Sequence, residues 1–364
     1  MAAAAGNGSA GRRCGRAASF VVALIFGLFA LAQLSVADAT TKRDWPTPVG
    51  LPAWLPGVNL SVGEFGSGQR LWFDYGYPNT AEIDYYAAKG FKVFRIPFRA
   101  NRLFDKSASG SLSFRSDRAA LEKLIDHAAS KHTFVILDMH DYGMSISGKL
   151  IGRDPGAAAE FARCWGRIGA WLKRKPNVIF ALMNEPNKQS ATEWLRGANA
   201  AIRAIREAGA GQTILVPGSY WDGAHSWVKT DNDTVMLGVR DPINNYAYEA
   251  HQYLDTYSTG DPSMPAVRGM GAVAAKPFTD WLRANGKRGF IGEFGFTAAS
   301  QSVTEGNALA KHLWQNRDVY LGFSYWAGGP WWGDYAFAVE PKNIGTANVT
   351  DRPQMGVLRR YLRQ

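Results

Sequence analysis

The feature that most constrains the fold of this chain is a regular alternation of short apolar segments with longer segments of helical periodicity. Eight apolar segments of five to seven residues, many of them β-branched or aromatic, are predicted to be strands: 57–61, 91–97, 133–139, 178–183, 213–217, 248–253, 289–293 and 320–326. This alternation predicts a parallel sheet covered by helices. Eight units in about 310 residues fit a closed (β/α)8 barrel with insertions better than an open, doubly wound sheet.

The segments between the strands have the periodicity of helices. The clearest are 80–89, 118–131, 157–174, 191–208, 267–285, 303–317 and 354–362. The fifth connection, residues 218–239, is irregular and rich in Trp and Asp, which predicts a short helix or a long loop. No glycine-rich phosphate loop follows the first strand, because Gly63-Glu64-Phe65-Gly66 does not match the dinucleotide fingerprint. Residues 57–364 are predicted to form a single domain.

The N-terminal segment is typical of a secretory signal peptide. Arg12, Arg13 and Arg16 precede an uncharged apolar run over 20–32, and small residues follow it. The signal is predicted to span 1–37, and residues 38–56, rich in Pro and Thr, are predicted to be a tail. A retained membrane anchor is the alternative, although the apolar run is short for a span. We expect a monomer that is secreted, extracellular or periplasmic, with no membrane attachment after cleavage.

Charge and cysteine content argue against two other classes of protein. Outside residues 1–37 the chain has 38 Lys and Arg against 31 Asp and Glu, a net charge of +7, and these charges are scattered. A nucleic-acid partner is not expected, since such binders concentrate cations on one face or arm. Only Cys164 remains after the signal, which excludes a zinc site built from cysteines.

Polar and titratable side chains gather at the carboxyl ends of the predicted strands. Among them are Arg95, His140, Asn184, Glu185, His251, Tyr253, Glu293 and Trp326. Active sites of (β/α)8 barrels lie at this face, whereas burying polar groups elsewhere costs free energy. Core packing does not explain the pattern, so these residues are the candidate site.

Two of these residues suggest a reaction. Glu185 and Glu293 end the fourth and seventh predicted strands, so they would face the same space from roughly opposite sides of the barrel mouth. Glycoside cleavage requires such a pair: an acid that protonates the leaving oxygen, and a carboxylate that attacks or activates water. A single Glu at a strand end is more often part of a structural ion pair, but two in matching positions indicate catalysis.

The same residues carry a resemblance to a known family. The eight residues named above at the strand ends, taken in order, resemble the active-site pattern of glycoside hydrolase family five. The similarity runs from about Gly57 to the C-terminus, and around Glu64-Phe65-Gly66, 223–227 and 329–335 it resembles the endo-β-1,4-glucanase branch. Two departures stand out: Asp141, where many members have Asn, and Ser219, where that branch often has Asn.

The resemblance implies a cellulase, an endo-β-1,4-glucanase with a retaining mechanism that acts on a β-glucan polysaccharide or oligosaccharide without cofactor or metal. Glu185 would be the acid/base and Glu293 the nucleophile. The remaining positions would bind substrate or orient these two: Arg95 and Tyr253 at Glu293, Asn184 at the sugar 2-OH, His140 and His251 at other hydroxyls, and Trp326 as the hydrophobic floor.

The last predicted loop adds two candidates. Trp331 and Trp332 stand between glycines and a proline after the eighth strand, so we interpret them as sugar-stacking or cleft-wall residues rather than core residues. Trp221 and Trp227, in the irregular fifth connection, leave both interpretations open.

Other functions stay open as alternatives. The same chemistry could act on mannan, xyloglucan or an exopolysaccharide, and a catalytically inactive barrel could serve only to bind carbohydrate. His140, Asp141 and His251 could be metal ligands, but the sequence offers no further ligands at metal spacing to complete such a site. A serine triad is not supported, because no Gly-x-Ser-x-Gly motif is present.

Overall fold

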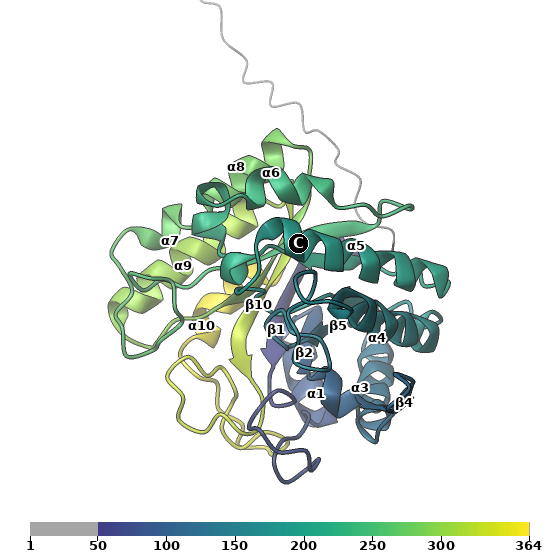
Figure 1. Cartoon of the computed structure of the whole chain (residues 1–364). Helices are drawn as coiled ribbons and strands as arrows, with labels where there is room; N and C mark the ends of the chain where they lie inside the picture. The colour runs from purple at the N-terminus through teal and green to yellow at the C-terminus, as the bar shows by residue number, and fades with distance from the viewer. Residues whose placement is uncertain (1–49, 364) are drawn as a thin grey trace, which may run out of the picture. The chain divides into compact units, whose positions relative to one another are not determined.

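Eight parallel strands close into a barrel in the computed structural model, which describes residues 50–363 (Figure 1). Their order around the barrel is β1-β10-β9-β8-β7-β6-β5-β2. The strands are β1 (Leu55–Leu60), β2 (Val93–Phe98), β5 (Phe134–Met139), β6 (Val178–Ala181), β7 (Ile214–Pro217), β8 (Tyr246–His251), β9 (Gly289–Phe294) and β10 (Tyr320–Gly328). The predicted (β/α)8 barrel is confirmed, and each predicted strand overlaps an observed one.

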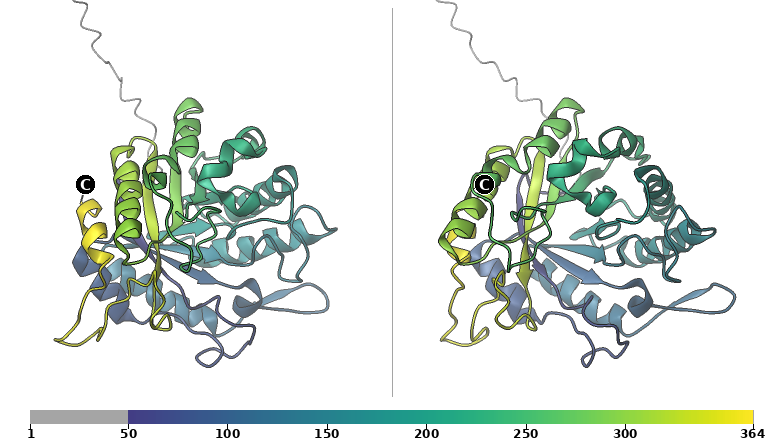
Figure 2. Two further views of the ribbon diagram at one scale, coloured as in Figure 1. Left: turned by 90° about the vertical axis from the view of Figure 1, so that its left-hand side faces the viewer. Right: turned by 60° about the vertical axis from the view of Figure 1, so that its left-hand side comes forward.

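Nearly every strand residue is buried, as parallel strands covered on both faces require. Inside the barrel, all eight strands contribute to one apolar cluster: Leu55, Val93, Ile136, Ile179, Ala181, Leu215, Ala247, Phe290 and Leu321. A larger apolar cluster fills the space between the strands and the helices. Figure 2 shows the helices arranged around the strands. This packed interior fixes the strand ends, and with them the loops that follow.

The main covering helices are α1 (Thr80–Lys89), α3 (Asp117–Ser130), α4 (Ala157–Leu172), α5 (Ala191–Glu207) and α9 (Ser300–Gln315). Helix α1 shows why the bounds were predictable. Asn79 caps its N-terminus in a capping box with Glu82, and Gly90 ends it with φ of 107°, a left-handed conformation that favours glycine.

Two predicted helices are interrupted. The segment 267–285 forms α7 (Met270–Val273) and α8 (Lys276–Ala284) instead of one helix, because Pro277 in the first turn of α8 has no N–H with which to continue a helix. The segment 354–362 forms α10 (Met355–Leu358) and a 3-10 turn, η4 (Arg359–Tyr361).

The irregular fifth connection consists of short pieces, η1 (Tyr220–Asp222), η2 (Ala224–Lys229), α6 (Asn232–Val235) and η3 (Met236–Gly238). After β2, α2 (Ala100–Leu103) and a small hairpin, β3 (Phe104–Lys106) with β4 (Leu112–Phe114), were not predicted.

The predicted signal peptide at 1–37 and most of the predicted tail at 38–56 lie outside the described residues. Strand β1 begins at Leu55, two residues before the predicted start of the barrel. No helix within residues 50–363 is long and apolar enough to cross a membrane.

Candidate active site

Arg95 lies at the centre of the residues that meet at the barrel mouth. Its fully buried guanidinium contacts five side chains from five different strands or strand ends, at 2.8–3.2 Å: Asn59, Asp138, Asn184, Glu249 and Glu293. Burial alone would lower the pKa of Arg95, but the surrounding carboxylates raise it above its ordinary value. Arg95 is therefore cationic, and its fixed donors orient the strand ends around it.

Glu293, near the end of β9, is held by one donor at each carboxylate oxygen. Arg95 Nη1 lies 3.0 Å from Oε1, and the Tyr253 hydroxyl donates to Oε2 at 2.7 Å. Burial raises the pKa of Glu293 above its ordinary value of 4.5, although the positive charges of His251 and Arg95 oppose this shift. The carboxylate is thus buried and fixed in orientation among polar side chains.

Glu185 follows β6 and has φ of 42°, in the left-handed region that is uncommon for residues other than glycine. Its Oε1 lies 2.8 Å from His251 Nδ1, and its side chain is more exposed than that of Glu293, at 15% against 5%. The same His251 nitrogen lies 3.6 Å from Glu293 Oε2. The two carboxylate oxygens are therefore at most about 6.4 Å apart, the sum of these two distances.

His140 and Trp326 form a stacked wall beside the carboxylates. Their ring centroids are 6.0 Å apart with an interplanar angle of 20°. His140 Nδ1 lies 2.7 Å from Asp138 Oδ2. Burial alone would lower the pKa of His140, but the charge of Asp138 raises it above 6.5. Trp332 meets the ring of Trp326 edge-on, with centroids 5.6 Å apart.

The sequence matches a known family of enzymes. The family model for cellulase, glycosyl hydrolase family 5, matches residues 50–329. The chain belongs to glycosyl hydrolase family 5. It is therefore a glycoside hydrolase, and the predicted family is confirmed.

Individual members of family 5 are similar over most of the chain. Endoglucanase gh5-1 of Neurospora crassa is 36% identical over 299 residues, which cover 81% of this chain and 74% of the relative. An endo-β-1,4-glucanase from Xanthomonas axonopodis pv. citri is 38% identical with a TM-score of 0.79, covering 85% of this chain and 98% of that one. The structure of XacCel5A in complex with cellopentaose is 37% identical with a TM-score of 0.79, covering 84% and 98%.

All ten site residues predicted from the sequence of this family 5 enzyme lie on the face formed by the strand ends. Eight of them form the network and wall described above. Trp331 and Trp332 lie in the loop after β10, where Trp331 is 43% exposed and Trp332 packs against Phe65 and Tyr335.

Three buried acids in the site were not predicted to belong to it. Asp138 and Glu249 contact Arg95 from within apolar strands, and a carboxylate in such a strand was a signal that could have been used.

Asp222 is fully buried, and neither of its oxygens has a hydrogen-bond partner among the described residues. One of these oxygens lies 3.6 Å from His251 Nδ1. Burial raises the pKa of Asp222 well above its ordinary value. No sequence signal in its irregular loop marks it.

Asp222 is also part of a group of side chains that could bind a metal ion. It joins Glu185 and His251 in a group whose potential ligand atoms lie within 4.8 Å of one another. Asp141, which the sequence suggested as a possible ligand, instead accepts a hydrogen bond from the Ala100 backbone at 2.8 Å. Burial raises the pKa of Asp141 to about 6.

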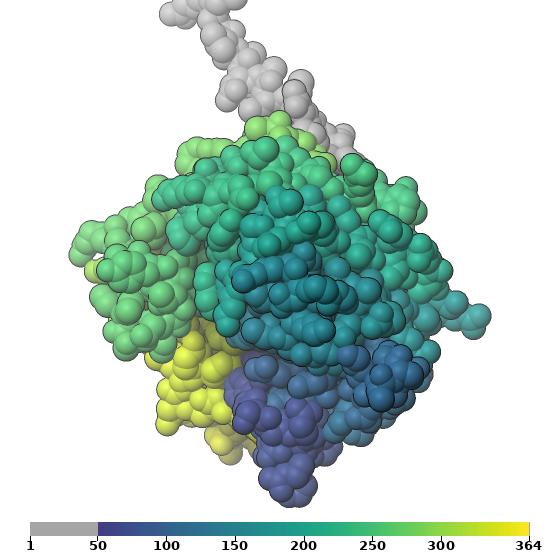
Figure 3. Space-filling view, viewed as in Figure 1, coloured from purple at the N-terminus to yellow at the C-terminus, as the bar shows by residue number. Residues whose placement is uncertain are grey.

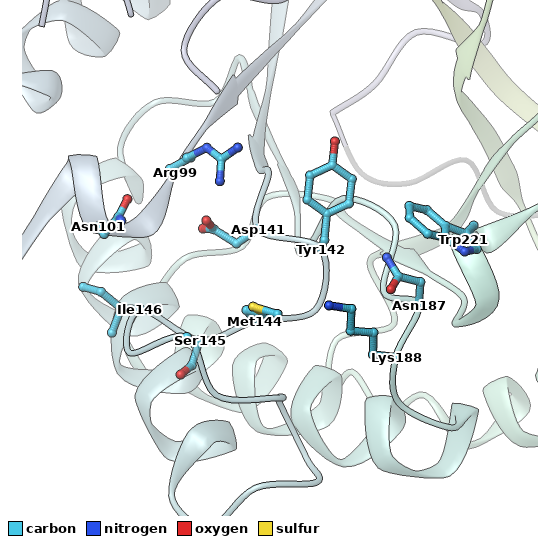
Figure 4. A pocket seen from close by; sticks show the side chains of 11 residues that line it. Arg99, Asn101, Asp141, Tyr142, Met144, Ser145, Ile146, Asn187, Lys188 and Trp221 are labelled. Carbon is cyan, nitrogen blue, oxygen red and sulfur yellow. The ribbon is translucent and has the colours of Figure 1, made fainter. Parts of the chain in front are cut away.

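A pocket of about 550 Å³ is drawn in Figure 4, and one of its lining residues, Asn187, donates to the backbone oxygen of Glu185 at 3.1 Å. Tyr142 and Trp221 line it with ring centroids 6.2 Å apart, and Arg99 and Lys188 extend toward its middle from opposite sides. Trp221 is 56% exposed, whereas Trp227 is fully buried against neighbouring aromatic rings. The alternatives left open for these two tryptophans thus have different answers: Trp221 lines a cavity and Trp227 is a core residue.

Proposed function

We propose that this family 5 enzyme is a secreted, retaining endo-β-1,4-glucanase that cleaves internal bonds of β-glucan by double displacement. The observation that supports this most is that Glu185 and Glu293 both lie within 3.6 Å of His251 Nδ1. The relatives named as endoglucanases favour β-1,4-glucan as the substrate.

In the first step, Glu293 attacks the anomeric carbon and the bond to the leaving oxygen breaks. Glu185 gives its proton to that oxygen, and a covalent glycosyl-enzyme forms. Arg95 and Tyr253 hold Glu293 so that an oxygen lone pair faces the sugar, which is the main contribution of their hydrogen bonds.

In the second step, Glu185, now a carboxylate, takes a proton from water. The water oxygen attacks the anomeric carbon, Glu293 leaves, and the product keeps the β configuration. His251 contacts both carboxyl groups, so its positive charge moderates the change in charge at each step. Burial would lower the pKa of His251, but Asp222 and Glu293 raise it well above its ordinary value.

The other side chains position the sugar. The Oδ1 atom of Asn184 accepts from Arg95 at 2.8 Å, which leaves the amide nitrogen to bind the sugar 2-OH. His140 binds a hydroxyl of the same ring, and Trp326 stacks under it. The leaving sugars would enter the pocket between Tyr142 and Trp221, next to the acid.

The separation of the carboxyl groups favours retention. Retaining enzymes place them about 5–5.5 Å apart, and inverting enzymes roughly 6.5–9.5 Å apart to admit a water molecule. The upper limit of about 6.4 Å between the two oxygens that face His251 is compatible with the retaining separation and reaches only the lower edge of the inverting range.

The test is product stereochemistry together with two variants. Proton NMR early in the reaction should detect the β anomer. Glu293→Gln should lose nearly all turnover, whereas Glu185→Gln should lose turnover of glucan but still form the intermediate from an activated aryl cellobioside. Azide should rescue Glu185→Ala and give a β-glycosyl azide. An initial α product would refute the assignment, and absence of turnover on every glycan would favour a carbohydrate-binding barrel.

A panel of purified polysaccharides tests the substrate. Sugar release from β-1,4-glucan should exceed release from mannan, xyloglucan or exopolysaccharide. If the enzyme prefers another polymer, the proposed mechanism would stand and the proposed substrate would be wrong.

The proposal includes the division of the chain into a signal peptide (1–37), a tail (38–56) and a catalytic domain (57–364), acting as a monomer. The secreted protein should begin near Gln33 or Asp38, because small residues spaced for signal peptidase precede both. N-terminal sequencing of exported protein tests this, and Met1 retained in a membrane fraction would contradict it.

A further inference from the structure

The exposed aromatic side chains of the barrel all lie on one face. Among residues 50–363, the exposed Trp, Tyr and Phe residues are Trp72, Phe73, Tyr220, Trp221, Tyr257 and Trp331. Each lies in a loop that follows the carboxyl end of a barrel strand, the face that holds the catalytic carboxylates. Exposing large apolar rings to water is unfavourable. Because the exposed rings are restricted to the face that holds the catalytic carboxylates, we interpret them as surfaces that bind substrate.

Two groups of these residues lie on opposite sides of the site. Trp221 follows β7 and lines the pocket beside Glu185. Trp72 and Phe73 follow β1, and Trp331 follows β10, which is four strands away from β6 in the closed order and therefore directly across the barrel. Because Glu185 protonates the leaving oxygen, the leaving sugars bind on its side. The opposite side receives the glycone part of the chain, on the far side of the reacting ring.

Trp72 and Trp331 lie close together although they are far apart in sequence. A methyl group added at Gly76 would lie 3.4 Å from an atom of each indole ring. Figure 3 shows the purple surface of the loop after β1 beside the yellow surface of the chain that follows β10. Trp72, Phe73 and Trp331, here called the outer platform, therefore belong to one region of the surface.

The loop that presents the outer platform is fixed by polar contacts. Arg70 and Asp74 form an ion pair at 2.9 Å on either side of Trp72 and Phe73, and Trp72 N donates to Tyr75 O at 2.7 Å. Beneath it, Arg102 is fully buried and donates to the backbone oxygens of residues 63, 66 and 68 at 2.8–2.9 Å. Two exposed rings are thus held on an ordered turn, which lowers the entropy cost of binding.

Aromatic contacts connect the outer platform to the reacting site. Trp326 contacts Trp332, and Trp332 contacts Phe65 at a centroid distance of 4.8 Å. Trp331 immediately precedes Trp332 in the chain and lies beside Trp72. The path of rings therefore leads outward from the floor of the site to the exposed edge of the barrel.

We propose that the outer platform binds glucosyl residues of a β-1,4-glucan chain on the glycone side, beyond those nearest the cleaved bond. The flat CH faces of an unbranched glucan match exposed rings, whereas a short substrate ends before it reaches them. This inference rests on the proposed function and adds a dependence on chain length to it.

The test compares long and short substrates in a Trp72→Ala/Phe73→Ala double variant. For cellohexaose, kcat/KM should fall roughly tenfold, mostly through KM, because two stacking surfaces are lost. For an aryl cellobioside, whose two glucosyl residues occupy the positions nearest the cleaved bond, kcat/KM should stay at the wild-type value. Ile243→Ala is the control, since Ile243 is similarly exposed but precedes β8 at the opposite end of the barrel.

Each outcome has one meaning. Unchanged cellohexaose kinetics in the double variant would show that the outer platform does not bind the glucan chain, and would leave the proposed function intact. An equal loss on both substrates would also overturn it, because the loop would then act on the catalytic centre. Trp72→Tyr should recover most of the cellohexaose activity if stacking is responsible. A wild-type enzyme without turnover of the cellobioside would refute the proposed function instead.

Discussion

Glu293 illustrates how the site sets the protonation of one residue. It is buried near four other carboxyl groups and one permanent cation: Asp138, Glu185, Asp222, Glu249 and Arg95. Buried carboxylates in such excess cannot all be ionised, because like charges in a dry site repel strongly. The donors that reach Glu293 favour its charged form, whereas Asp222 has no hydrogen-bond donor among residues 50–363.

The pH dependence of catalysis follows from this environment. A protonated Glu293 cannot attack, so activity is present above its pKa and is lost as the pH falls through it. Because burial raises that pKa, the acidic limb of kcat/KM against pH should lie above 4.5. Tyr253→Phe removes a donor to the ionised form, so it should move the limb to still higher pH. A limb below 4.5, or one that does not move in Tyr253→Phe, would contradict this role.

Trp326 and Trp331 are expected to differ in their kinetic effects. Trp326→Ala removes the ring under the reacting sugar and the stacking partner of His140, so kcat should fall roughly 100-fold through lost positioning. Trp331→Ala should mainly raise KM for long chains. Steady-state kinetics on cellohexaose measure both, with circular dichroism as the folding control. Wild-type kcat in a folded Trp326→Ala protein would remove Trp326 from the site.

At the scale of elements, helix α1 contains a carboxyl group that costs stability. Burial raises the pKa of Glu82 from 4.5 to about 7, and the nearby Glu340 adds to this shift. Below pH 4.5 the group is neutral in both folded and unfolded states, so it has no effect. Between pH 4.5 and 7 the carboxyl group ionises in the unfolded state but not in the folded state, so the free energy of unfolding falls as the pH rises. Above pH 7 this loss of stability amounts to roughly 3 kcal/mol.

Glu82→Gln should therefore raise Tm by several degrees at pH 8 and much less at pH 5. Thermal unfolding at the two pH values measures this difference. Glu193→Gln in α5 is the matched control, since Glu193 has the same place in a capping box but is partly exposed. The prediction would be wrong if Glu82→Gln changed Tm equally at both pH values.

At the scale of the whole molecule, the enzyme is expected to act without a metal ion. The group formed by Glu185, Asp222 and His251 has ligand chemistry, but His251 Nδ1 and Glu185 Oε1 already contact each other at 2.8 Å. Activity on glucan should survive dialysis against EDTA, because the proposed steps use only side chains. Metal analysis of the dialysed enzyme is the control. Loss of activity that zinc or calcium restores would show that this group holds a metal.

The sequence was sufficient to predict the barrel and the positions of the candidate residues. Strand and helix patterns are local, since burial on both faces makes a strand apolar and caps such as Asn79 mark helix ends. The polar residues at strand ends stood out against these apolar runs. The interruption of the predicted helix 267–285 near Pro277 is also a local feature, but it was not predicted because the residues around Pro277 have helical periodicity.

Only the tertiary structure decided which of these side chains meet and what surrounds them. Arg95 and Glu293 are 198 residues apart, and closure of the barrel brings them to 3.0 Å. The same closure buries Asp222 beside His251, makes Trp227 a core residue and places Trp72 against the loop of Trp331. The physical reason is that charge, burial and stacking depend on distances through space, which local sequence patterns do not encode.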